Sequence, residues 1–302
     1  MKKVLFLPVI AVLIFFSCKR DHSAATKPAG KKYKVSFNVS NFTNKLGGFS
    51  NSKLKINSTD TLTTLNGYLD ILHYIVYDEI GHTLHFLVQD STDANMGMFV
   101  DSLPAGNYQI VFVAGTKELN VPHFLTPSDG FGYPGAKWQD TFWGTIPLTV
   151  DNGNISREVV LKRVIGKLEL TILDNIPANA DSLIFTVNPE AATHWNSSGD
   201  PQGQPFDQVT YGVKIPDAAK GHANFTVDRL IGNTVIPFTT TIVCKDAGNH
   251  VLGSAQADNV VVHANVKTIL SGNLFGSGPA TNTQSFTVKI DTAWLNAPPY
   301  SF

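Results

Sequence analysis

Residues 69–90 read LDILHYIVYDEIGHTLHFLVQD, and this stretch decides the class of fold. Its first ten residues are apolar on both faces, which is typical of a central strand in a β-sandwich. EIGH at 79–82 then turns the chain, and Gly81 is available for the positive φ that tight turns need. In residues 83–90, Leu84, Phe86 and Val88 share one phase of an alternating pattern. The stretch therefore predicts a β-hairpin.

A similar pattern returns later in the chain. IVYDEIGH at 75–82 is echoed by IVCKDAGN at 242–249, as Ile-Val, two residues, an acid, a small or apolar residue, Gly and a polar residue. In each case a strand-like run precedes the match and an apolar segment follows it. An internal echo at the same place of a hairpin indicates two similar β modules.

Further segments have the period of strands. YKVSFNV at 33–39 alternates apolar and polar residues, and residues 106–115 place Tyr108, Ile110 and Phe112 on one face. Short strand-like runs with turn residues between them continue to the C-terminal region, which is the pattern of β-sandwiches. The fold class predicted is all-β, with two tandem Ig-like β-sandwich domains.

The boundary between these domains is predicted from a change of phase in residues 157–173. Val159 and Leu161 share one phase, whereas Leu168 and Leu170 share the other. A single strand cannot change phase without a bulge or a handover to a second strand. We place the handover at 163–166, so that the first domain spans residues 33–163 and the second spans residues 164–302.

The N-terminal residues have the pattern of a targeting signal. Lys2 and Lys3 precede an apolar run at 4–16, which is too short to cross a bilayer and fits a secretory signal. The run ends in Ser17-Cys18 and so resembles the lipobox of bacterial lipoproteins, in which the cysteine is acylated. Residues 1–17 are predicted to be a lipoprotein signal peptide, Cys18 to carry the acyl chains, and residues 18–32 to form a flexible tether.

Lipidation of Cys18 leaves Cys244 as the remaining cysteine of the mature chain, which excludes an intramolecular disulfide. Cys244 is in phase with Ile242 and Phe238, so we expect a small buried residue rather than a catalytic thiol.

Composition restricts the partners. The 302 residues are 43% hydrophobic and 16% charged with a formal net charge of −1, which favours folded cores over disorder. Outside the tether the chain has no basic block, so nucleic acid is not expected as a partner.

No sequence motif indicates a catalytic, cofactor-binding or metal-binding site. Nucleophile-elbow, phosphate-loop, dinucleotide and zinc-protease patterns are absent. His82 and His85 are three residues apart, which places them on opposite faces of a strand and disfavours a shared metal ion. Asp90, Asp93 and Asp101 lack the spacing of a calcium loop. The chain is therefore predicted not to be an enzyme and to hold no cofactor or metal.

A long irregular stretch at 118–145 is rich in Pro, Gly and aromatic residues. It packs its own aromatics over a sandwich edge, or it is a recognition loop. In the second interpretation Trp138, Phe142, Trp143 and Trp195 stack on sugar rings. We expect at least Trp143 to be buried, because Gly144 and an apolar alternation follow it.

With these features together, the chain resembles the fimbrillin-associated anchor subunits of Bacteroidetes-type envelopes. The resemblance covers roughly residues 33–290 and rests on LHYIVYDEIGHTLHF, FVDSLPAGNYQIVFVAG, VVLKRVIGKLELTI and VKTILSGNLFG. It implies two transthyretin-like sandwiches held by lipid in the outer membrane, with fimbrial subunits joined by strand addition.

The predicted function is therefore a lipid-anchored structural or adhesion protein of the cell envelope, an anchor or accessory subunit of a surface fimbria. The alternative is a glycan-binding surface lipoprotein of a sugar-uptake system. The two differ in whether the loop aromatics are exposed or packed.

Overall fold

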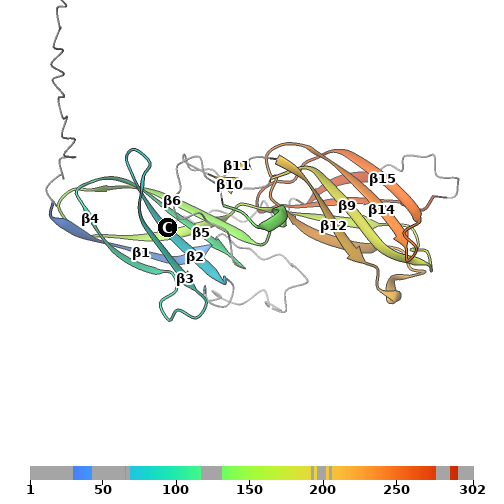
Figure 1. Cartoon of the computed structure of the whole chain (residues 1–302), viewed down its shortest axis with the longest axis horizontal. Coiled ribbons are helices and arrows are strands. Elements are labelled where there is room, and N and C mark those ends of the chain that lie inside the picture. Colours follow the sequence, from blue (N-terminus) through green and yellow to red (C-terminus); the bar gives the residue numbers. More distant parts are fainter. Residues whose placement is uncertain are drawn as a thin grey trace, which may run out of the picture.

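The computed structural model describes residues 30–42, 65, 69–116, 131–191, 194–195, 202–203, 206–276 and 286–291. Within these residues the regular structure is β-strand with two short 3-10 helices, at Pro134–Ala136 and Asp217–Ala219, so the predicted all-β class is confirmed. No helix in this part of the chain is long and apolar enough to cross a membrane. The strands form two halves that lie end to end (Figure 1).

The first half is one seven-stranded sheet in the order β3-β2-β5-β6-β7-β1-β4. Its strands are β1 Lys32–Phe42, β2 Ile71–Asp78, β3 Thr83–Asp90, β4 Met98–Pro104, β5 Gly106–Gly115, β6 Thr141–Val150 and β7 Ile155–Arg163. β6 and β7 pair only at Phe142 with Arg163 and Trp143 with Lys162. The sheet folds at this short contact, and its two parts enclose a core that contains Phe37, Tyr74 and Phe112.

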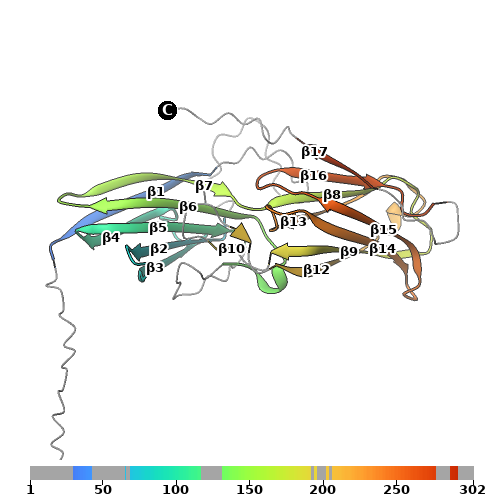
Figure 2. The same ribbon diagram turned by 90° about the horizontal axis from the view of Figure 1, so that it is seen from above.

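The second half consists of two four-stranded sheets, in the orders β12-β9-β14-β15 and β13-β8-β16-β17. Their strands are β8 Gly166–Ile172, β9 Ala180–Ala191, β12 Phe206–Lys214, β13 Phe225–Ile231, β14 Phe238–Asp246, β15 Val251–Val260, β16 Lys267–Gly272 and β17 Phe286–Asp291. A two-stranded ribbon, β10 His194–Trp195 with β11 Gln202–Gly203, lies near the joint of the halves (Figure 2). The sheets enclose a separate core around Phe185, Phe238 and Ile242.

The two halves share one strand order. In each half the first strand is antiparallel to one neighbour and parallel to the other: β1 lies between β4 and β7, and β8 lies between β13 and β16. The opposite layers then correspond as β3-β2-β5-β6 and β12-β9-β14-β15. Two segments with very different sequences therefore adopt the same topology, apart from the additional strand β17.

The predicted change of phase is present in the structure. Val159 and Leu161 on β7 point into the first core, whereas Leu168 and Leu170 on β8 point into the second. The strand ends at Arg163 and a new one begins at Gly166. The phases differ because the two runs belong to different cores.

The echoed sequences form the same turn. After β2, the carboxylate of Asp78 accepts the backbone N–H of His82 at 2.8 Å. After β14, the carboxylate of Asp246 accepts the backbone N–H of His250 at 2.9 Å. DEIGH at 78–82 and DAGNH at 246–250 are therefore equivalent turns.

This equivalence corrects the sequence interpretation in two respects. The residue with positive φ is Gly81 in the first turn (86°) and Asn249 in the second (66°), so the echo is shifted by one residue from the alignment that pairs Gly81 with Gly248. In addition, β2–β3 corresponds to β9–β12, whereas β14–β15 corresponds to β5–β6. The echo is a recurrent turn, and it does not mark equivalent hairpins of the two halves.

Candidate functional site

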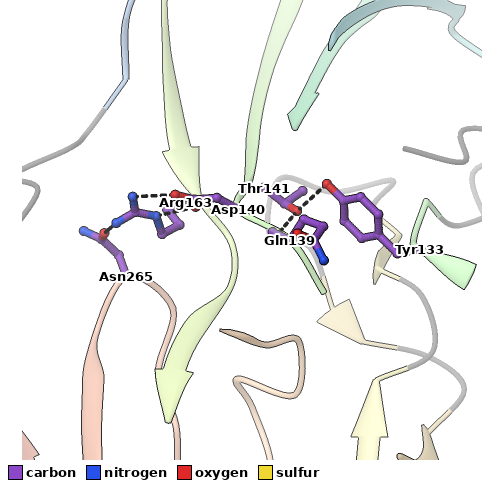
Figure 3. Close-up of polar contacts among 6 residues, drawn as sticks. All are labelled: Tyr133, Gln139, Asp140, Thr141, Arg163 and Asn265. Atoms are coloured by element: carbon purple, nitrogen blue, oxygen red, sulfur yellow. Dashed lines mark hydrogen bonds and ion pairs between the residues drawn. The ribbon is translucent and has the colours of Figure 1, made fainter. Parts of the chain in front are cut away.

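The most complete polar cluster of the described residues lies where the two halves meet (Figure 3). Arg163 ends β7, and its guanidinium donates from Nε to Asp140 Oδ1 at 2.6 Å and from Nη2 to Asp140 Oδ2 at 2.9 Å. Its Nη1 donates to Asn265 Oδ1 at 2.9 Å, from the loop before β16. The Arg163 side chain is 0% exposed and lies over the ring of Phe142. A buried, forked ion pair within the first half therefore orients Arg163, and the hydrogen bond to Asn265 ties this half to the second.

Backbone contacts fix the start of the second half beside this joint. The N–H of Asn265 donates to the carbonyl of Ile165 at 2.8 Å, and the N–H of Lys167 donates to Val266 at 3.0 Å. A Cβ at Gly166 would overlap the Val262 side chain and the His263 carbonyl. The chain passes so close to the 263–266 loop that only glycine fits at this position.

Aromatic residues of the segment 131–143 form the second contact of the joint. Trp138 is buried, and its Nε1 donates to the carbonyl of Ala191 on β9 at 2.8 Å. A Cβ at Gly232 would collide with the indole. Tyr133 meets Trp138 edge to face, with ring centroids 5.8 Å apart. The segment therefore packs over the outer face of the first half and reaches the second.

Glu190 lies beside this contact and is fully buried. Its Oε1 accepts the backbone N–H groups of Ala191 at 2.7 Å and Asn233 at 2.6 Å. Burial raises the pKa of Glu190 to about 7, although the hydrogen bonds to Ala191, Asn233 and Gly232 act in the opposite direction. Desolvation of the charged carboxylate outweighs the donors that stabilise it.

Three of the four aromatic side chains that the alternative interpretation assigns to a sugar site are packed instead. Trp138, Phe142 and Trp143 are all buried, and the predicted burial of Trp143 is confirmed. Trp143 stacks on Phe131 with ring centroids 5.4 Å apart. Trp195 lies on β10, and its side chain is outside the described part of the structure. The described part of the stretch thus agrees with a loop that packs its own aromatics.

The histidines and the second cysteine carry no shared site. His85 Nδ1 lies 2.6 Å from Asp101 Oδ2, whereas His82 Nδ1 lies 3.7 Å from Asp78 Oδ2. Among the described residues no group of three or more His, Cys, Asp or Glu side chains could hold a metal ion. Cys244 is buried as predicted, and burial raises the pKa of its thiol to about 11. Cys18 lies outside the described residues.

The two edge strands of the first half carry a feature that the sequence did not single out. Five of their large apolar side chains are exposed: Leu84, Leu87 and Val88 on β3, and Met98 and Val100 on β4. The Gln89 side chain donates to the Met98 carbonyl at 3.0 Å and accepts the Gly97 N–H at 2.8 Å. Side chains thus bridge β3 and β4, and each of these strands pairs with a neighbour on one side only.

A sequence signal existed for the joint. Arg163 continues the phase of Val159 and Leu161, which both face the core. A charged residue at an apolar position predicts a buried ion pair. Its partners Asp140 and Asn265 are 23 and 102 residues away, and no local pattern connects them.

This fold and joint define the class: an all-β protein of two halves joined by buried polar and aromatic contacts. A model of the family described as fimbrillin-A associated anchor proteins Mfa1 and Mfa2 matches residues 45–296, and the chain belongs to this family. The predicted family and the predicted role as a fimbria-associated surface protein are thereby confirmed. The family is one of anchor and adhesin proteins, structural rather than catalytic.

Two solved structures share this fold. The fimbrial anchor protein Mfa2 from Porphyromonas gingivalis is similar with a TM-score of 0.55 and 10% identity, over 86% of this chain and 97% of that chain. A candidate adhesin from Bacteroides thetaiotaomicron is similar with a TM-score of 0.51 and 10% identity, over 89% and 98%. No curated protein matches the sequence.

Proposed function

We propose that this protein is a lipid-anchored subunit at the base of a surface fimbria, held in the outer membrane by acyl chains on Cys18. The match to the anchor family over residues 45–296 is the observation that carries this proposal. The sequence order of basic residues, apolar run and Ser17-Cys18 supports cleavage after residue 17. Acyl chains on a tether at 18–32 would hold the folded part close to the membrane surface.

The folded part is proposed to be two tandem transthyretin-like, Ig-like sandwiches, residues 33–163 and 164–302. The shared strand order of the two halves and their separate cores support this division. The buried joint suits a load-carrying anchor, because a hydrogen bond from Arg163 to Asn265 and one from Trp138 to Ala191 join the two halves.

Fimbrial subunits are proposed to join by strand addition at the edges β3 and β4. An edge strand presents unpaired N–H and C=O groups to a partner strand. The exposed apolar side chains of these two edges add contact area that a single solvated strand would lack. A fimbrillin-type subunit with an extended apolar segment is the expected partner.

The anchor is tested by expressing Cys18→Ala in the native organism and fractionating the envelope. We expect the variant in the soluble fraction, and mass spectrometry of the parent protein should find an acylated N-terminal Cys18. An unmodified N-terminus at another residue would contradict the anchor.

The partner is tested by crosslinking and co-purification from the native envelope. The variants Met98→Lys and Val100→Lys place charges on edge β4, and edge charges block strand pairing. Val251→Lys, at an exposed position of β15 in the second half, is the matched control. Loss of β-rich subunits from the two β4 variants alone is expected; equal recovery from all three would contradict strand addition at this edge.

A further inference from the structure

The outer face of the sheet β12-β9-β14-β15 is hollowed into a depression of about 440 Å³. Eight side chains line it, and none is ionisable: Ile184, Thr186, Asn188, Gln208, Thr239, Thr241, Val243 and Gln256. The hollow lies on the face opposite the core of the second half, and none of its lining residues belongs to the edges β3 and β4.

The strand register arranges these side chains in rows. One row crosses all four strands with Thr210, Thr186, Thr241 and Gln256. The next row contains Gly212, Ile184, Val243 and Ser254. The face thus combines a polar row of hydroxyls and a carboxamide with an aliphatic strip formed by Ile184 and Val243.

Part of the lining is already oriented. Asp258 at the margin accepts hydrogen bonds from Thr239 Oγ1 and from Gln256 Nε2, both at 2.9 Å. In the described part of the chain, no hydrogen bond engages the side chains of Thr186 and Thr241. Hydroxyls and carboxamides both donate and accept, so these groups can bond a ligand that does the same.

The charge and the apolar area of this face restrict the class of ligand that it could bind. A charged ligand would lose water here without a counter-charge in the lining itself, because the charged side chains of this face, Asp258, Lys214 and Lys245, lie outside the lining. A protein partner needs large apolar side chains at the centre of its interface. The lining contains none of the exposed large hydrophobic residues; Val251, at the start of β15, is the one that this sheet carries in the described ranges.

We propose that this face binds a neutral saccharide. The hydroxyls and carboxamides hydrogen-bond the hydroxyls of the sugar, and the strip of Ile184 and Val243 contacts the apolar side of a ring. The site uses no aromatic side chain and is separate from the packed aromatics of residues 131–143. It goes beyond anchoring and does not depend on it.

The test uses the full chain in a detergent without a sugar headgroup. Cellotetraose, maltotetraose, mannotetraose and chitotetraose are the neutral probes, tetragalacturonate is the acidic one, and calorimetry measures binding. We expect saturable binding of at least one neutral probe and none of the acidic one. Absence of binding to all four neutral probes, or stronger binding of the acidic probe, overturns the proposal.

Two variants locate the site. Gly212 has open space where a Cβ would be placed, so Gly212→Phe covers the face without a clash. Thr241→Val removes one hydroxyl at almost constant volume. We expect each to weaken binding about tenfold or more, which corresponds to about 1.4 kcal/mol. Thr171→Val, on the outer face of the other sheet, is the control and should bind like the parent. Binding that survives Gly212→Phe overturns the proposal.

Discussion

The two halves share a strand order, yet the outer faces of their equivalent sheets are opposite in character. In the first half, Val111, Ile75 and Phe86 form a row across β5, β2 and β3, and aromatic residues cover this face. The corresponding row across β14, β9 and β12 is Thr241, Thr186 and Thr210, and it is open. The inner faces are apolar in both halves, because each encloses a core.

The connections explain the contrast. β5 and β6 are joined by the long stretch that includes residues 131–140, whereas β14 and β15 are joined by the turn 247–250. An apolar face needs a cover, and the chain supplies it from the loop that starts at that face. A face without a cover is polar. The same topology can therefore serve as a packed joint in one half and as an open surface in the other.

The largest expected effect comes from breaking the joint with Arg163→Met. The variant leaves the Asp140 carboxylate buried without its counter-charge, and we expect a loss of about 3–5 kcal/mol in the free energy of unfolding. Denaturant unfolding followed by circular dichroism measures it. Arg157→Met, at an exposed position of the same strand, is the control. Equal losses in both variants would contradict a structural role for the ion pair.

The two buried carboxylates near the joint, Asp140 and Glu190, differ in their partners. A measurement of stability against pH tests this difference. Asp140 faces a guanidinium, whereas Glu190 accepts backbone N–H groups, and burial raises the pKa of Glu190 from 4.5 to about 7. The folded state therefore binds this proton more tightly than the unfolded state. The contribution of Glu190 to stability falls as pH rises from 4.5 to 7, by up to about 1.4 kcal/mol per pH unit.

Unfolding midpoints of the parent and of Glu190→Gln, measured at several pH values across this window, test the assignment. The variant should lose the downward slope that Glu190 causes. Glu79→Gln, in the exposed turn after β2, should retain it. A slope that is identical in all three proteins would show that Glu190 does not titrate here.

Trp138→Phe weakens the packing of the aromatic residues in segment 131–143 at the joint. The change removes the donor to the Ala191 carbonyl and part of the buried ring, and we expect a loss of about 1–3 kcal/mol. Trp143→Phe is the matched control, because its buried Nε1 has no hydrogen-bond partner in the described structure. The control should lose less in thermal unfolding; the reverse order would contradict the role of the Trp138 hydrogen bond.

The smallest effects concern the two equivalent turns. Gly81→Ala places a Cβ at a φ of 86° and should cost about 1–2 kcal/mol. Asn249→Gly, at the same place in the other turn, should change stability by less than about 0.5 kcal/mol. Gly81→Asn is expected to lie between them in denaturant unfolding. If Gly81→Ala leaves stability unchanged, the positive φ at Gly81 does not constrain the turn, and the equivalence of Gly81 and Asn249 would be contradicted.

Local patterns predicted much of the fold. The hairpin at 69–90, the strand with Tyr108, Ile110 and Phe112, and the change of phase near residue 163 follow from alternation and turn residues. The burial of Cys244 followed from its phase with Ile242. The echo failed as a guide to equivalent strands. A five-residue turn is set by its own aspartate and by one residue at positive φ, Gly81 or Asn249, and it recurs wherever a hairpin needs it.

By itself, the sequence determined the all-β class, the resemblance to the family and the phase of several strands, because alternation, turn residues and short motifs depend on neighbours a few residues apart. The tertiary structure alone decided that Arg163 meets Asp140 and Asn265, that Trp138 closes the joint, and that the face around Thr241 is bare. Strand pairing in a sandwich joins residues far apart in the chain, so the groups that share a site leave no common spacing in the sequence.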